Sequence, residues 1–250
     1  VARVAGRSRW QLLLHGPVGS ELPLPPGSAL WDELPRGVAL SVDPDPMELE
    51  PVLEALSGCT KPVLVIGSQA TLEPGQIEEL QESVRRLGLP TYLGGMARGL
   101  LGKDDPLQLR HKRGKALKEA DLVIIAGFPF DFRLGYGRSI NKKAVLISAN
   151  RSATDLKKNR RPTHAFRCDP GRFLKMLASR FTSTPQTWRG WFDTLQSRED
   201  QRDSEITAMA SDTGEYVNPV TAVQALESAM SDDAVMVVDG GDFVATAAYV

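Results

Sequence analysis

The sequence predicts an α/β fold: a doubly wound parallel sheet forms a Rossmann-like domain over residues 46–182, and an incomplete second α/β unit follows it. Two observations support this. Short runs such as 62–66 are apolar throughout, which is typical of strands buried on both faces of a sheet. Amphipathic segments separate these runs, and parallel strands need such a crossover between them.

The elements of this domain can be assigned in order from their periodicity. A first helix carries apolar residues at i, i+3, i+4 and i+7, namely Leu49, Val52, Leu53 and Leu56. Strands are predicted within KPVLVIGSQ (61–69), LPTYLGG (89–95), ADLVIIAG (120–127), KAVLISAN (143–150) and HAFRCD (164–169). Helices are predicted at 74–88, 106–119 and 154–159, and a last one at 170–181 closes the domain.

The flanking segments differ from this pattern. Residues 1–45 are rich in Pro and Gly and are expected to be a linker or the edge of a preceding domain. Residues 183–214 predict a connecting helix with an aromatic stripe and a solvated polar tail. Residues 215–250 predict one helix, which starts at the cap Asn218 with Pro219 in the first turn, and the strand 235–238.

Composition excludes several classes of protein. The formal net charge of −1 indicates no overall attraction to nucleic acid or to an anionic membrane. Cys59 and Cys168 form no CxxC pair, so they predict free thiols rather than a cysteine zinc site. No apolar run approaches the ~20 residues of a membrane-spanning helix.

Three loops that follow predicted strands carry arginines suited to an anionic ligand. Arg98 lies in the glycine-rich loop GGMARGLLG, Arg133 in DFRLGYGR and Arg151 in SANRS. Open α/β sheets bind ligands at the carboxyl ends of their strands. The alternatives are a merely flexible glycine loop and ordinary surface arginines. The basic run RHKRGK (110–115) predicts a solvated helix face.

The residues at the end of the fourth predicted strand indicate which kind of ligand these arginines would bind. An NAD site places an acidic residue at such a position to hold the ribose, whereas here Asn150 and Arg151 occupy it. We therefore expect a phosphorylated adenine nucleotide, or the adenosine end of CoA, rather than NAD. Neither GxGxxG nor the P-loop motif is present. The three histidines lie apart in the sequence, so we assign no catalytic residue and no metal ligand within the chain.

The order of several motifs resembles the thiamine-diphosphate-dependent enzymes of the acetolactate synthase and 2-hydroxyacyl-CoA lyase group, above all its animal members. GPVGSELP resembles the end of their first domain, although Gly19 and Ser20 replace the usual residues. KPVLVIGSQA, LPTYLGGMARGLLGKDDP and ADLVIIAGFPFDFRLGYGR resemble the central domain. NPVTAVQALESAM and VMVVDGGDFVATAAY resemble the opening of the diphosphate-binding domain.

The resemblance implies a cofactor and its site. Thiamine diphosphate and Mg²⁺ would serve the parent protein, and Gly240, Gly241, Asp242 and Phe243 would lie at the diphosphate, where a helix N-terminus can hold an anion. The activating glutamate of the family belongs to the first domain, and its GDG…N magnesium motif would follow residue 250. We therefore expect this chain to be a fragment that is inactive when isolated.

The resemblance also implies an activity for the parent, which is cleavage of a 2-hydroxyacyl-CoA to a shortened aldehyde and formyl-CoA. The alternatives are an acetolactate synthase-type carboligase acting on a 2-ketoacid and, in another class, a nucleotide-binding module without catalysis. The parent is expected to form a homo-oligomer, a dimer or tetramer, and to bind no nucleic acid. Its expected location is the endoplasmic reticulum membrane, held by an anchor outside this chain, with the cytoplasm as the alternative.

Overall fold

The computed structural model describes residues 43–102, 104–182, 186–211, 214–231, 234 and 246–247, together with the backbone of strands at 2–3, 11–15, 21–22 and 39–42. The chain divides into two compact units. The first comprises residues 1–109 and 113–192, and the second comprises residues 110–112 and 193–250.

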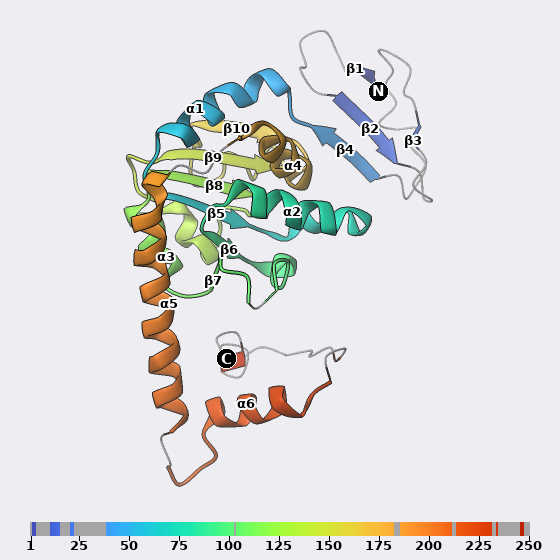
Figure 1. Cartoon of the computed structure of the whole chain (residues 1–250). Helices are drawn as coiled ribbons and strands as arrows, with labels where there is room; N and C mark the ends of the chain where they lie inside the picture. Colours follow the sequence, from blue (N-terminus) through green and yellow to red (C-terminus); the bar gives the residue numbers. More distant parts are fainter. Residues whose placement is uncertain are drawn as a thin grey trace. The chain divides into compact units, whose positions relative to one another are not determined.

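A six-stranded parallel sheet forms the centre of the first unit (Figure 1). Its strands, in chain order, are β5 (Pro62–Ile66), β6 (Thr91–Leu93), β7 (Gln108–Leu109), β8 (Leu122–Ala126), β9 (Val145–Asn150) and β10 (His164–Arg167). Their spatial order is β10-β9-β8-β5-β6-β7, which is the order of a Rossmann fold. The chain reverses its direction of travel between β5 and β8, so the topological switch point lies there. The predicted fold class is confirmed.

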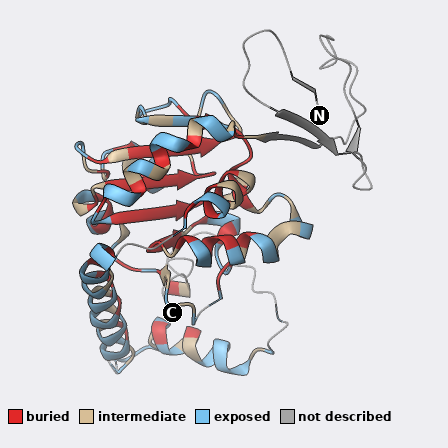
Figure 2. Ribbon diagram, turned by 45° about the horizontal axis from the view of Figure 1, so that its top comes forward, coloured by how far each residue is buried: buried red, intermediate tan, exposed pale blue. Residues whose placement is uncertain are grey.

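One face of the sheet packs against α1 (Glu50–Gly58), α2 (Ile77–Leu87) and α4 (Pro170–Arg180). Alternate strand residues, such as Leu64 and Ile66 of β5, join this core, and both are fully buried. Phe173 of α4 is also fully buried, and its ring lies 4.9 Å from that of Phe166. Burying a side chain of this size contributes roughly 2–3 kcal/mol of transfer free energy. Figure 2 shows the strands as the most continuously buried part of the unit.

The opposite face of the sheet is covered with less regular structure. The chain now travels in the reverse direction, so right-handed crossovers place α3 (Arg113–Glu119) and the two connections that follow it on this side. The first connection, 127–144, holds only the short helix η5 (Phe132–Gly137), and the second, 151–163, holds no helix. Their apolar side chains Phe130, Leu134, Ile140 and Leu156 are nevertheless buried.

Two sequence predictions on this face are wrong. The helix predicted at 106–119 begins only at Arg113, because Gln108 and Leu109 pair with β6 as a sixth strand. The helix predicted at 154–159 is a series of turns, in which Asn159 takes a left-handed backbone (φ 66°). The other predicted helices of the domain form at α1, α2 and α4, and α2 ends at Gly88 in the left-handed conformation (φ 63°) that glycine favours at this position.

Residues 1–45, predicted as a linker or a domain edge, contain four paired strands. β1 (Ala2–Arg3), β2 (Gln11–His15), β3 (Glu21–Leu22) and β4 (Ala39–Asp43) form an antiparallel sheet in which β2 contacts the other three. Whether this sheet is the edge of a preceding domain stays a prediction.

A helix forms within the segment 183–214, where one was predicted: it is α5 (Arg189–Ala210), and its first residues belong to the first unit. Trp188, just before it, donates a hydrogen bond from Nε1 to the carbonyl of Cys59 (3.0 Å), and Trp191 donates likewise to Pro62 (3.0 Å). The two tryptophans of the predicted aromatic stripe are therefore both buried and hydrogen-bonded.

The second unit contains the rest of α5 and α6 (Pro219–Ala229). Within it, the buried carboxylate of Glu199 accepts hydrogen bonds from the backbone N–H groups of Arg110 (2.9 Å) and His111 (2.8 Å). Asn218 caps α6 by accepting from the N–H of Val220 (2.9 Å), which confirms the predicted cap. The predicted strand at 235–238 lies outside the described residues.

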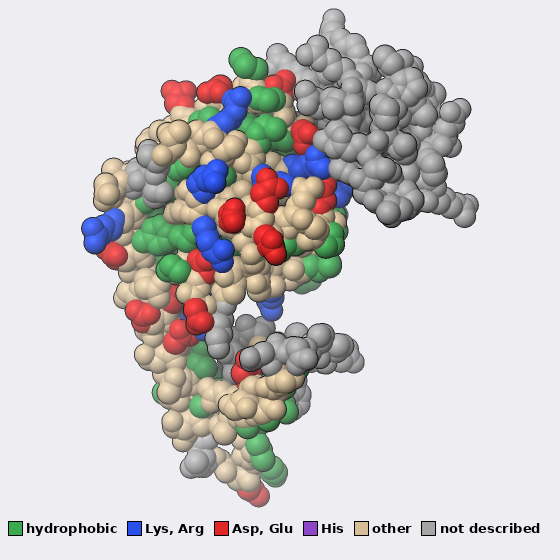
Figure 3. All heavy atoms as spheres, turned by 45° about the vertical axis from the view of Figure 1, so that its right-hand side comes forward, with side chains coloured by type: hydrophobic (Ala, Val, Ile, Leu, Met, Phe, Trp, Pro, Cys, Tyr) green, Lys and Arg blue, Asp and Glu red, His purple; other side chains and the backbone are tan. Residues whose placement is uncertain are grey.

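Acidic and basic side chains are interspersed on the face turned forward in Figure 3. Over the part of the chain that the structure describes, no helix has both the length and the apolar composition that crossing a membrane requires.

Candidate functional site

The candidate site lies at the carboxyl edge of the sheet, beside the switch point between β5 and β8. Phe128, two residues after β8, lies across the ends of β5 and β6. A side chain at Gly67 or Gly94, which follow these two strands, would collide with its ring. Glycine at both positions therefore lets the aromatic ring lie directly against the backbone.

Two arginines, Arg113 and Arg133, lie over this ring, and a third, Arg98, lies close enough to Arg113 to affect its pKa. Each of the three follows a different strand. Arg98 comes from the loop after β6, Arg113 is the first residue of α3 after β7, and Arg133 comes from η5 after β8. The guanidinium carbon of Arg133 lies 4.9 Å from the centre of the Phe128 ring and that of Arg113 lies 5.7 Å from it. Arg113 also donates a hydrogen bond from Nη2 to the carbonyl of Arg133 (2.6 Å).

The electrostatics show that positive charge is in excess here. Burial lowers the pKa of the half-buried Arg113, and the nearby charges of Arg98 and Arg133 lower it further, while Tyr92 opposes them. Asp131 forms a salt bridge with Arg133 (2.6 Å), and the hydrogen bonds from Arg133 hold the pKa of that carboxyl below its usual range. The cluster is therefore suited to bind an anion, because an anion would relieve the repulsion between the guanidinium groups.

The structure does not bring Arg151 into this cluster. The Arg151 guanidinium lies 3.6 Å from the carboxylate of Asp169, and its backbone N–H donates to the side chain of Gln69 (2.9 Å). Asn150, at the end of β9, accepts a hydrogen bond from the N–H of Ser152 (2.8 Å) and so stabilises its own turn. Of the three arginines proposed from the sequence, Arg98 and Arg133 belong to this cluster, whereas Arg151 lies beside the carboxylate of Asp169.

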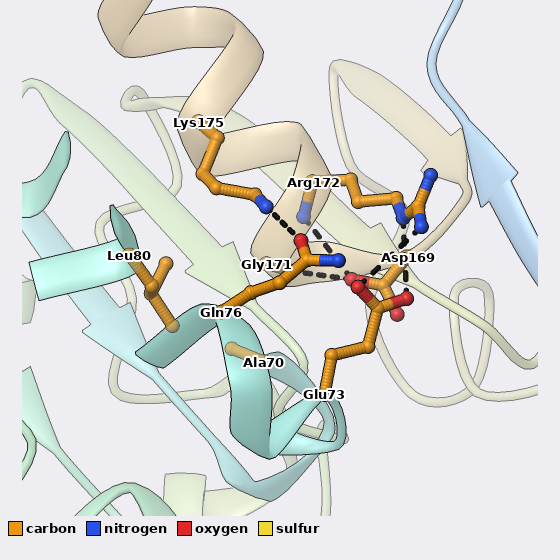
Figure 4. Close-up of a pocket in the computed structure, with 8 residues that line it drawn as sticks. All are labelled: Ala70, Glu73, Gln76, Leu80, Asp169, Gly171, Arg172 and Lys175. Atoms are coloured by element: carbon orange, nitrogen blue, oxygen red, sulfur yellow. Dashed lines mark hydrogen bonds and ion pairs between the residues drawn. The ribbon is translucent and has the colours of Figure 1, made fainter. Parts of the chain in front are cut away.

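A small pocket lies near Arg151, between α4 and the segment that leads into α2 (Figure 4). Its charged side chains are paired. Arg172 forms salt bridges with Glu73 (3.2 Å) and with Asp43 (3.2 Å), and Lys175 forms one with Glu79 (2.9 Å) and hydrogen-bonds to Gln76. The full lining is Ala70, Glu73, Gln76, Leu80, Asp169, Gly171, Arg172 and Lys175. Because cations and carboxylates match here, the pocket is part of the structural framework.

Asp169 caps α4 from the edge of this pocket by accepting hydrogen bonds from the N–H groups of Gly171 (2.9 Å) and Arg172 (3.1 Å). Burial raises the pKa of Asp169, and the hydrogen bond from Arg172 opposes that shift. A carboxylate already occupies this helix N-terminus, so a bound anion there would meet like charge.

Sequence reasoning missed Arg113. It was included in a basic run predicted to be a solvated helix face, because the two-residue strand β7 could not be distinguished from a helix start. The signal available was the position of Arg113 after the apolar Leu107 and Leu109, which follow a turn at Asp105 and Pro106. The diphosphate-loop residues Gly240, Gly241, Asp242 and Phe243 lie outside the described residues, so their role stays a prediction.

The remaining candidate groups show little reactive character. Cys59 and Cys168 are free and buried, as predicted, and burial raises the pKa of Cys59 to about 12. Within the described ranges, no three His, Cys, Asp or Glu side chains converge in a way that could hold a metal ion.

Comparisons with known proteins agree with this architecture. The family model of the thiamine pyrophosphate enzyme central domain matches residues 49–177. A mouse protein named 2-hydroxyacyl-CoA lyase 2 is 40% identical over 228 residues, which is 88% of this chain and 36% of that protein. Its human counterpart is 37% identical over the same shares of the two chains. A probable acetolactate synthase of Mycobacterium bovis is 30% identical over 84% of this chain and 37% of that protein.

The fold and its carboxyl-edge site therefore define a Rossmann-like domain of an α/β enzyme. More particularly, the chain belongs to the thiamine pyrophosphate enzyme family, of which residues 49–177 form the central domain. The chain spans about a third of the length of the curated relatives that it matches.

Proposed function

We propose that this chain is part of a thiamine-diphosphate-dependent lyase that cleaves 2-hydroxyacyl-CoA to a shortened aldehyde and formyl-CoA. The similarity to proteins named 2-hydroxyacyl-CoA lyase 2, at 37–40% identity over most of the chain, carries this proposal. The acetolactate synthases are more distant, at 30%, and support carboligation as the second candidate. Thiamine diphosphate supplies the carbon–carbon bond chemistry in such enzymes, and Mg²⁺ is proposed as its metal partner.

The experiment is an assay of the full-length protein with thiamine diphosphate and Mg²⁺. A 2-hydroxyacyl-CoA should yield formyl-CoA and the shortened aldehyde in equal amounts, both measured by mass spectrometry. Formation of acetolactate from a 2-ketoacid, without lyase activity, would favour the second candidate. The 250-residue chain alone is expected to give no turnover with either substrate.

We further propose that Arg98, Arg113 and Arg133 bind the phosphates of an adenine nucleotide or of the adenosine end of CoA. Three observations support this assignment: Arg113 and Arg133 lie over the Phe128 ring, Arg98 is close to Arg113, and the carboxylate of Asp131 pairs with Arg133. Titration of the chain with ADP, CoA and NAD is the test, and tighter binding of ADP or CoA than of NAD is expected. If NAD bound most tightly, the assignment would be wrong.

The parent is also proposed to form a homo-oligomer and to reside at the endoplasmic reticulum membrane. Light scattering of the purified full-length protein and fractionation of cells test these two points. A monomer in the first measurement, or a cytoplasmic distribution in the second, would contradict them.

A further inference from the structure

The two connections without α-helices on the α3 face of the sheet form a strongly basic surface. Its seven cations come from residues 137–144 and 156–163, two segments that contain no Asp or Glu. The chain has 30 Lys and Arg against 31 Asp and Glu, so the remainder carries an excess of acidic side chains. The residues of this basic surface are Arg138, Lys142, Lys143, Lys157, Lys158, Arg160 and Arg161.

Specific contacts hold the two segments together. Arg160 donates a hydrogen bond from Nη2 to the carbonyl of Asn141 (3.0 Å), and Asn159 donates from its side chain to the carbonyl of Phe130 (2.8 Å). The side chain of Arg160 also lies so close to Gly137 that a Cβ there would come within 2.8 Å of it. The cations are thus presented from a fixed backbone, although they lie far apart in the sequence.

The cations of the basic surface are available to a partner. All are exposed except Arg160, which is half-buried. Across the described residues, no salt bridge joins any of the seven to an acidic side chain, and Asp131 is a nearby carboxylate, whose pKa the charge of Lys158 helps to lower. Arg138 instead lies over the ring of Tyr136 (5.5 Å), an aromatic side chain that is 44% exposed. Tyr136 adopts a left-handed backbone (φ 56°), which is uncommon for a residue with a side chain.

We propose that the basic surface docks the protein onto a membrane that contains anionic phospholipid. Its charges are spread over two segments, which suits several headgroups rather than one small anion. Lysine and arginine clusters are attracted to such membranes, and an exposed aromatic ring with a polar tip fits the membrane interface. A concentration of positive charge on one surface would orient that surface toward a negatively charged plane.

The test is co-sedimentation of the purified chain with phosphatidylcholine vesicles, with and without phosphatidylserine. We expect binding to the anionic vesicles to be at least about tenfold tighter than to the neutral ones, and to weaken as salt is added. The Lys157→Glu/Lys158→Glu double variant should lose about tenfold or more in affinity for the anionic vesicles.

The matched control is the Arg86→Glu/Arg189→Glu variant, which changes the net charge by the same amount at two exposed positions outside the two segments of the basic surface. It should retain most of the binding. Urea unfolding of both variants establishes that each is folded. Equal losses in the two variants, or no preference for anionic vesicles, would overturn the proposal. Binding of a polyglutamate peptide without any vesicle binding would also overturn it, and would assign the surface to an acidic protein segment.

Discussion

Two groups of arginines in the first unit have opposite electrostatic settings. Arg172, between α4 and the segment before α2, is matched by the carboxylates of Glu73 and Asp43. Arg98, Arg113 and Arg133 gather at the carboxyl edge, where Asp131 pairs with one of them. The first arrangement stabilises the fold, while the second keeps like charges together at a cost that a bound anion would offset. The same residue type thus stabilises the fold in one setting and leaves positive charge in excess in the other.

The largest effect is expected when Arg172 is removed from its two carboxylate partners. Arg172→Met leaves the carboxylates of Glu73 and Asp43 without their cation in a partly buried setting, so we expect a loss of about 2–3 kcal/mol in the free energy of unfolding. Urea denaturation measures it. The control is Arg133→Met, which removes a more exposed arginine and should cost under about 0.5 kcal/mol. Equal losses would show that the two groups do not differ.

Arg113→Met should have the next largest effect, on ligand affinity rather than on stability. It removes one of three converging guanidinium groups, and we expect about a tenfold loss of affinity for ADP in calorimetric titration, equivalent to about 1.4 kcal/mol. Arg151→Met is the matched control and should leave that affinity unchanged, because Arg151 faces Asp169. An equal loss of affinity in both variants would show that Arg151 also contributes to ligand binding.

Asp131→Asn tests whether the excess positive charge of the cluster determines its affinity for an anion. It removes the carboxylate that neutralises Arg133 and keeps an oxygen that can accept from the backbone N–H of Arg133. We expect the affinity for ADP to rise about two- to threefold, since the free positive charge of the cluster increases. Unchanged or weaker binding would mean that the excess positive charge does not determine the affinity for ADP.

The smallest effect concerns the pH dependence of stability. Burial raises the pKa of Asp169, so the folded chain binds this proton more tightly than the unfolded chain does. Its contribution to stability is therefore fully present below the usual carboxyl pKa and is lost as the pH rises through the raised value. Asp169→Asn keeps the cap of α4 and should flatten this slope between pH 4 and neutral pH. Parallel pH profiles for the two proteins would contradict it.

The sequence alone determined the class of the fold. The apolar runs of β5, β8 and β9 and the helical periodicity of α1, α2 and α4 reflect burial that is local in sequence, so they could be predicted. The caps of α2 and α6 followed from Gly88 and Asn218 for the same reason. Two elements failed, β7 and the turns at 154–159, because each is short and is fixed by contacts with distant residues rather than by its own periodicity.

Only the tertiary structure decided which charges meet. Sequence order predicted that Arg98, Arg133 and Arg151 follow strands, which is correct, but strand order in the sheet separates Arg151 from the others and brings in Arg113. It also places residues 137–144 beside residues 156–163. The seven cations of the basic surface therefore lie together, although the whole chain has a net charge of −1. The physical reason is that hydrophobic periodicity is a local property of the chain. Electrostatic interactions act through space and depend on neighbours that only the folded topology supplies.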